Sequence, residues 1–503
     1  MTINFKREYF FILTIMNLIS LNSNAQSFQW SKNVPSITET DYEMDYWVSN
    51  KLYQISSKYN LDVFNKDVRA TSYFLDNLDR DKTNDLSIEQ PTIGKAMMTH
   101  LKMFQEKGEN GVIFLDEFNT KTRERELFWQ RVNVDTNVKT NPALITSMPG
   151  RNSNYTISQS QNKLFYAVIK EYTLDKKTNE KINITLLDKD FKIIKEITYE
   201  TPYLNKSPFN NDLYVSNQGS VFIIKYIDLA KMRPFKTVFF WDGKTETLQE
   251  NSLKFDNDYQ IYQYRANFNN DDFYVQGLYT KTGSKGFQIG SDAIPAAGIY
   301  AARFNEKGEK KYTEASETGQ IVGLNLKDFA FDSNKTWFFA DKMMVSKKAK
   351  PVAPGSFKYE YDYTYSNNAF VFGKIDNDTG KLEWFKDIPF EEHSTTNDDG
   401  IFLSYLHFIS NNQLIILFND TQPTVIEGHK ASDRFTAIET YDDRGNPVSK
   451  SLIPETGLEL KYNHGFEENF DLDTSLNIKI QDGKYIVRAK SPYGNEKNGY
   501  LTF

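Results

Sequence analysis

The chain of 503 residues contains 39% hydrophobic and 25% charged residues, a balance typical of a folded globular protein and not of a disordered one. Its 60 basic and 67 acidic residues give a net charge of −7, so no basic field is present to hold a phosphate backbone and we expect no nucleic-acid partner. The sequence has no cysteine, which excludes disulfides, thiolate metal sites and a cysteine nucleophile.

The first 25 residues have the order of regions of a secretory signal peptide. Lys6 and Arg7 form the positive start, residues 9–21 are an apolar run, and Ser23 and Ala25 are small residues at the cleavage positions. A transmembrane helix needs about 20 apolar residues, and this run is shorter. We therefore predict cleavage after residue 25, export to the periplasm, cell surface or medium, and no membrane span in residues 26–503.

Two segments near the N-terminus have apolar residues at helical spacing. They are residues 39–59 and 93–104. Short N-terminal helices are therefore kept as an alternative to strands in this part of the chain.

The segment 79–90 resembles a calcium loop in part. Asp79, Asp81 and Asp85 occupy ligand positions, but Gln90 stands where such a loop needs a bidentate glutamate. The same residues suit a polar hairpin turn, since Asp and Asn favour turns. We favour the hairpin and expect no metal and no cofactor.

One local pattern, a polar turn followed by an apolar and aromatic strand, recurs along the chain. The first apolar residues of its six copies run from Leu164 to Tyr485 at a mean spacing of about 64 residues. Tyr and Phe, present 30 and 38 times, favour strands and a large buried core.

A second pattern interleaves with the first. It is a strand, a turn rich in Asp, Asn and Gly, and a further strand, and seven copies can be counted between residues 74 and 452. Two strand pairs per repeat give about four strands in 64 residues, the size of a large propeller blade. We predict one all-β propeller over residues 26–503, with about seven blades and six or eight as near alternatives. The first and last strands should share a blade, with residues 485–489 pairing near the chain start.

The most specific candidate for binding is a tyrosine row. Tyrosines alternate at positions 359, 361, 363 and 365, so a strand would place all four on one face. A turn-rich segment at 346–358 precedes this row and is predicted to form an exposed loop. The turn that contains Asp398 and Asp399 follows about two strands later, which predicts that both loops emerge on the same side of a propeller. Aromatic rings and carboxylates suit a sugar or a peptide. We predict that a ligand site would use Tyr361, Tyr363, Asp398 and Asp399, with packing of the tyrosines between blades as the alternative.

No residues stand in a recognised catalytic pattern. The five histidines lack the spacing of a helical zinc site, and neither a nucleophile elbow nor a phosphate-binding loop occurs. His407 lies within an apolar strand and is interpreted as a packed residue. Pairs of carboxylates occur mainly in turns, where Asp is favoured for backbone reasons. No catalytic residue is therefore assigned.

The stretch from Tyr361 to Phe418 contains the tyrosine-rich strand, then VFGKIDNDTGKLEWFKDIP, then TTNDDGIFLSY, then a strand ending in LFND, and the chain closes with GYLTF. In these motifs it resembles a group of uncharacterised secreted proteins of Bacteroidetes-type bacteria. The resemblance implies a propeller-like fold and export, and it implies no activity. No C-terminal sorting domain is recognised, so type IX secretion is not expected.

The leading interpretation is an exported, monomeric β-propeller that acts as a binding or scaffold module for a protein or glycan. The alternative is a carbohydrate-active enzyme, a glycosidase or lyase, on the same fold, since fold does not determine function. An enzyme would need carboxylates that converge with shifted pKa values, whereas a binding module would need an exposed aromatic or apolar surface.

Overall fold

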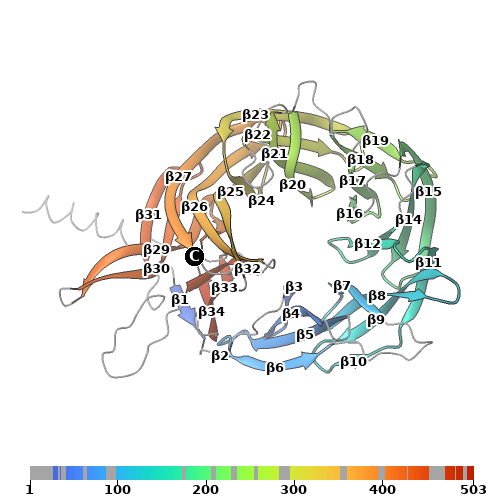
Figure 1. Ribbon diagram of the computed structural model, residues 1–503, viewed down its shortest axis with the longest axis horizontal. Coiled ribbons are helices and arrows are strands. Elements are labelled where there is room, and N and C mark those ends of the chain that lie inside the picture. Colours follow the sequence, from blue (N-terminus) through green and yellow to red (C-terminus); the bar gives the residue numbers. More distant parts are fainter. Residues whose placement is uncertain are drawn as a thin grey trace, which may run out of the picture.

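The computed structural model describes residues 27–31, 34–35, 41–60, 65–86, 98–172, 177–204, 211–227, 235–253, 259–281, 295–351, 359–394, 403–426, 429–452, 471–481, 483–490 and 495–502. Every regular element in these ranges is a strand. The strands form eight antiparallel sheets arranged as blades around one centre (Figure 1). The prediction of a single all-β propeller is confirmed, with eight blades in place of about seven.

Each blade is a meander whose first strand lies nearest the centre and whose last strand lies at the rim (Figure 1). Blade 1 consists of β3 (Asp41–Val48), β4 (Lys51–Asn60), β5 (Asn65–Phe74) and β6 (Arg80–Asp85). Blade 2 consists of β7 (Thr99–Gln105), β8 (Asn110–Asn119) and β9 (Glu124–Asn133), with β10 (Val138–Lys139) and β11 (Ala143–Pro149) both pairing with β9. Blade 3 consists of β12 (Asn154–Gln159), β13 (Phe165–Glu171), β14 (Asn179–Asp188) and β15 (Ile193–Leu204). Blade 4 consists of β16 (Asn211–Val215), β17 (Val221–Ile227), β18 (Phe235–Trp241) and β19 (Gln249–Ser252).

The second half of the ring continues the same order. Blade 5 consists of β20 (Tyr259–Asn269), β21 (Asp272–Lys281), β22 (Ala296–Phe304) and β23 (Lys310–Ile321). Blade 6 consists of β24 (Leu324–Asp332), β25 (Lys335–Pro351), β26 (Tyr359–Asp376) and β27 (Leu382–Ser394). Blade 7 consists of β28 (Tyr405–Ser410), β29 (Gln413–Ile426), β30 (His429–Tyr441) and β31 (Pro447–Leu452). Blade 8 consists of β32 (Asp471–Gln481), β33 (Lys484–Lys490) and β34 (Asn495–Thr502), completed by β1 (Ser27–Trp30).

The N-terminal strand closes the ring. β1 pairs with β34 from Ser27 opposite Thr502 to Trp30 opposite Gly499, and β2 (Val34–Pro35) extends the same edge. The two ends of the chain therefore share a blade, as predicted. We predicted that residues 485–489, which lie in β33, would pair near the chain start. β33 pairs with β34 instead, and β34 is the strand that pairs with β1.

Closure explains why the sequence pattern gave seven repeats. The turn between the third and fourth strands of a blade, called here the outer turn, was the basis of that count. Blade 8 has no outer turn, because its fourth strand comes from the other end of the chain. One counted copy, residues 114–129, is the turn between β8 and β9, but it still marks blade 2.

Helices were considered for residues 39–59, and this expectation is wrong. Within that segment the described residues form β3 and most of β4, and Tyr53 and Ile55 are buried against blade 2. Of the segment 93–104, residues from 99 onward belong to β7, and residues 93–97 lie outside the described ranges. Tertiary burial between blades overrides the helical spacing, since bulky apolar residues also suit a strand that packs on both faces.

The core lies between the blades. The second strands of blades 4 and 7 are apolar on both faces, with VFIIKYI in β17 and LIILF in β29. One cluster between blades 4 and 5 joins Phe222 and Phe240 to Phe273, with the rings of Phe222 and Phe273 stacked at 4.4 Å. Among the described residues, no helix is long and apolar enough to span a membrane.

Candidate functional site

Blade 6 carries a β-hairpin that extends past its own sheet. β24 pairs with β25 only as far as Lys342, and β27 pairs with β26 only as far as Tyr365. Beyond these points β25 and β26 continue as a two-stranded ribbon to the pair Pro351 and Tyr359. The predicted loop at 346–358 is thus, in its described part, the end of strand β25, which rises from one face of the disc.

The four alternating tyrosines lie on this ribbon. The register places Tyr365 opposite Val345, Tyr363 opposite Lys347 and Tyr361 opposite Ala349, so the tyrosines share one face of the ribbon. The rings of Tyr363 and Tyr365 stack at 6.4 Å with an angle of 26°. Tyr365 is buried at the base, whereas Tyr363 is only half-buried.

Asp398 and Asp399 lie outside the described residues, and so do the side chains of Tyr359 and Tyr361. The two ends of the segment that contains the aspartates are nevertheless fixed beside the hairpin. Ser394 pairs with Tyr365, and the backbone carbonyl of Leu403 accepts a hydrogen bond of 2.6 Å from buried Asn367. Both ends therefore meet β26 within two residues of Tyr365.

A polar cluster joins blades 6 and 7 below this hairpin, and sequence reasoning missed it. Lys327 of the innermost strand β24 donates a hydrogen bond of 2.6 Å to the hydroxyl of Ser404, which donates in turn to Asp341 across 2.8 Å. The Lys327 ammonium also lies 4.9 Å from the ring centre of Tyr405. Burial lowers the pKa of Lys327 and raises the pKa of Asp341. The only trace of this cluster in the sequence is a Lys-Asp pair inside an apolar strand.

His407 of β28 lies next to the same cluster. Its Nε2 is 3.5 Å from the carboxylate of Asp328, and its ring stacks on Phe339 at 3.8 Å. Burial lowers the pKa of His407, and the nearby Asp328 opposes this effect. The interpretation of His407 as a packed strand residue is consistent with this stacking.

The described part of the calcium-like segment, residues 79–86, contains β6, the second strand of the β5–β6 hairpin. Asp81 and Asp85 lie in strand β6, and Asp81 accepts a hydrogen bond from Ser72 and pairs with Lys51. Gln90 lies outside the described residues. Among the residues that the structure describes, no group of three acidic or histidine side chains is arranged to hold a metal ion.

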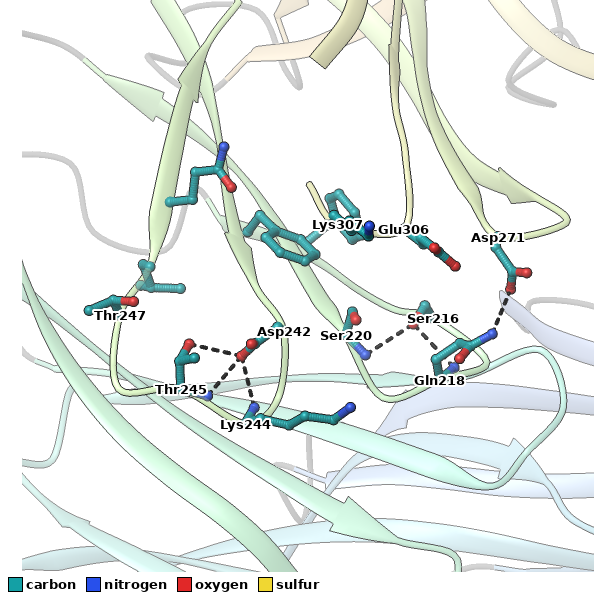
Figure 2. Close-up of a pocket in the computed structure, with 14 residues that line it drawn as sticks. Ser216, Gln218, Ser220, Asp242, Lys244, Thr245, Thr247, Asp271, Glu306 and Lys307 are labelled. Atoms are coloured by element: carbon teal, nitrogen blue, oxygen red, sulfur yellow. Dashed lines mark hydrogen bonds between the residues drawn. The ribbon is translucent and has the colours of Figure 1, made fainter. Parts of the chain in front are cut away.

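A pocket of about 540 Å³ opens on the opposite face of the disc, between blades 4 and 5 (Figure 2). Turns of both blades line it, and several of their polar side chains stabilise those turns. Asp242 accepts hydrogen bonds from the backbone of Lys244 and Thr245, and Ser216 accepts two from its own turn. Burial alone would raise the pKa of Asp242, but the hydrogen bonds from its turn outweigh it and lower the pKa.

Comparison with known proteins gives no family for this chain. No family model matches the chain, and no curated protein sequence matches it. The β-propeller domain of the Trilobed protease from Pyrococcus furiosus is similar in structure, with 10% identity, a TM-score of 0.35, and coverage of 82% of this chain and 98% of that one. The polysaccharide lyase Uly1 shows 9% identity, a TM-score of 0.34, and coverage of 80% and 89%. The WD40 domain of SCAP from fission yeast shows 8% identity, a TM-score of 0.35, and coverage of 94% and 98%. Similarities at this level carry no argument about activity.

Proposed function

We propose that the protein is an exported binding module, and that it binds an oligosaccharide on the face from which the β25–β26 hairpin rises. The observation that carries this proposal is the hairpin itself. A two-stranded ribbon outside a sheet contributes little to the core, and this one carries a row of alternating tyrosines, of which Tyr365 is buried at the base and Tyr363 is half-buried. Planar aromatic rings offer a large apolar surface at a low cost in conformational entropy, and a sugar ring can pack on such a surface.

Chain length limits where the two aspartates can lie. Asp398 is four residues from Ser394, so its Cα lies at most about 14 Å from that anchor. Asp399 is four residues from Leu403, which is held by Asn367. These chain lengths allow both carboxylates to contact a ligand bound at Tyr361 and Tyr363, and carboxylates accept hydrogen bonds from sugar hydroxyls.

A binding module is preferred to an enzyme because the groups with shifted pKa values, Lys327 and Asp341, form contacts between blades. Lys327, Ser404 and Asp341 are bonded to one another across the boundary of blades 6 and 7, and Asp341 and Ser404 are buried. This series of hydrogen bonds holds blades 6 and 7 together. An enzyme of the glycosidase or lyase class would instead need such groups to reach a substrate.

The test is a glycan array probed with the wild-type protein and with the double variant Tyr361→Ala/Tyr363→Ala. We expect the wild type to retain a defined set of oligosaccharides and the double variant to lose them. Asp398→Asn should weaken the same binding. The control is Tyr172→Ala, which removes a half-buried tyrosine of blade 3. Glycan binding that survives the double change in a folded protein would place the site elsewhere, and binding of peptides alone would contradict the ligand class.

A further inference from the structure

Ion pairs link neighbouring blades in a regular way. At five blade boundaries a cation of one blade pairs with a carboxylate in the outer turn of the next blade. The pairs are Lys51 and Lys82 with Asp135, Arg131 with Asp190, Lys195 with Glu246, Arg303 with Asp378, and Lys374 with Asp443. Among the six boundaries from blade 1 to blade 7, that of blades 4 and 5 differs. The outer turn of blade 5 contains Glu306, and no cation in the described part of blade 4 forms an ion pair with this carboxylate.

The sequence of blade 4 explains this exception. In blade 5, Arg303 lies opposite Tyr312, and both face the outer turn of blade 6. In blade 6, Lys374 lies opposite Trp384, and both face the outer turn of blade 7. In blade 4 the corresponding pair is Phe240 opposite Gln249.

The turn glycines show which ring covers the outer turn at each of these boundaries. A Cβ added to Gly380 would lie 2.4 Å from the ring of Tyr312, and one added to Gly445 would lie 2.7 Å from Trp384. Gly308 instead lies against Phe240 of the third strand, with a distance of 2.2 Å, and the fourth-strand residue opposite Phe240 is Gln249. Blade 4 therefore has an apolar ring where the next blades have a cation, and a glutamine where they have a large aromatic ring.

The pocket between blades 4 and 5 is the space left beside Gln249, where the next blades have a large aromatic ring. Gln249 begins β19, which has only four residues and no aromatic residue. Gln249 and Glu306 both line the pocket, with Phe240 and Phe222 among its apolar residues. Figure 2 shows Glu306 and Asp271 at one end of the pocket and Thr247 at the other. A volume of about 540 Å³ is within the range of small-ligand sites.

The polar groups around the pocket divide into two sets. Ser216 and Asp242 are occupied by their own turns, and Asp271 accepts a hydrogen bond of 3.3 Å from Gln218. Glu306, by contrast, has no hydrogen-bond or ion-pair partner among the described residues. Two ammonium groups, those of Lys244 and Lys307, also line the pocket and would compete with a ligand for Glu306.

We infer that this pocket binds the guanidinium group of an arginine-containing peptide. The group would lie beside Phe240 and Gln249 and take the role that Arg303 and Lys374 play at the next two boundaries, with Glu306 as its carboxylate partner. A guanidinium can form two parallel hydrogen bonds with a carboxylate, an advantage over the competing lysines. Its alkyl chain would lie along Phe240 and Leu248. The site is on the face opposite the tyrosine hairpin, so it is independent of the proposed function.

The test uses Nα-acetyl-arginine methylamide as the probe, with the neutral citrulline analogue as its matched control, and measures binding by isothermal titration or ligand-observed NMR. We expect the arginine probe to bind and the citrulline probe to bind at least about tenfold more weakly, since one charge-assisted interaction is lost. Glu306→Gln should cause a similar loss. This variant changes an exposed turn residue, so it should fold normally.

Two further variants separate this site from others. Gln249→Tyr should block the pocket, as Tyr312 does at the next boundary, and abolish binding of the arginine probe. Asp443→Asn removes a turn carboxylate that Lys374 already occupies, and it should leave binding unchanged. Equal binding of the arginine and citrulline probes, no binding of either, or binding that Glu306→Gln does not weaken would overturn the inference.

Discussion

The hydroxyl of Tyr73 in blade 1 donates a hydrogen bond of 3.1 Å to the carboxylate of Glu496 in blade 8, across the seam where the ring closes. Both side chains are fully buried, and Arg80 of blade 1 approaches the same carboxylate at 3.3 Å. Glu496 belongs to β34, the strand that pairs with the N-terminal strands β1 and β2. One carboxylate therefore ties blade 1 to the strand on which closure depends.

Replacing Glu496 should destabilise the protein more than replacing an exposed glutamate. Glu496→Ala leaves Arg80 and Tyr73 without their acceptor in a buried site, and we expect a loss of about 3–5 kcal/mol in the free energy of unfolding. Tyr73→Phe removes one hydrogen bond and should cost about 1 kcal/mol. Denaturant unfolding followed by fluorescence measures both. Glu200→Ala, at an exposed pair with Lys181, is the control and should change stability by less than about 0.5 kcal/mol.

The N-terminal strand should be essential to the closed ring. Cleavage after residue 25 would leave one residue before β1, so a mature protein beginning at Gln26 keeps this strand. A chain beginning at Asn33 lacks β1 and exposes the edge of β34 over the four residues that β1 covers. Exposed edges pair with other chains, so we expect a lower melting temperature and association on size-exclusion chromatography. An equally stable monomer would show that closure does not depend on β1. N-terminal sequencing of exported protein tests the cleavage site itself.

Much of the fold could be predicted from local patterns, because each blade repeats the same turns and apolar strands. Six of the seven counted hairpins are outer turns, those of blade 1 and of blades 3 to 7. Blade 8 could not be counted in this way, since its closing strand at Ser27–Trp30 is separated from β34 by the whole chain. Pairing between the two ends leaves no local turn to recognise.

The candidate sites were predicted less completely. Alternation alone was enough to place Tyr361 and Tyr363 on one face of a strand. The chain from Lys327 to Ser404 and Asp341 depends on contacts between blades, which no spacing in the sequence reveals. The pocket beside Glu306 exists because blade 4 lacks the cation and the fourth-strand aromatic ring that the next blades have. This difference is recognised only when the paired residues of neighbouring blades are compared in register.

His407 should make stability depend on pH. Burial depresses its pKa in the folded state, whereas the unfolded pKa is about 6.5. As pH falls below about 6.5 the unfolded chain therefore takes up a proton that the folded protein does not, and stability decreases towards the folded pKa. The charged groups that face His407 are Asp328, which opposes the shift, and Lys327, which adds to it. His407→Phe keeps a ring to stack on Phe339 and should flatten the difference in unfolding free energy between pH 5 and pH 7. An unchanged difference would assign the pH dependence to other groups.

Lys327 and Asp341 should be strongly coupled in a double-mutant cycle. Lys327→Met leaves the Asp341 carboxylate buried with only Ser404 as a donor, and we expect a loss of about 3 kcal/mol. Asp341→Leu leaves the ammonium group without its carboxylate and should cost a similar amount. Burial opposes the charge of both groups, as the directions of their pKa shifts show, so removing both charges removes both desolvation penalties. The double variant should therefore regain most of the lost stability in denaturant unfolding. Strictly additive losses would show that the two side chains act separately and that Ser404 does not link them.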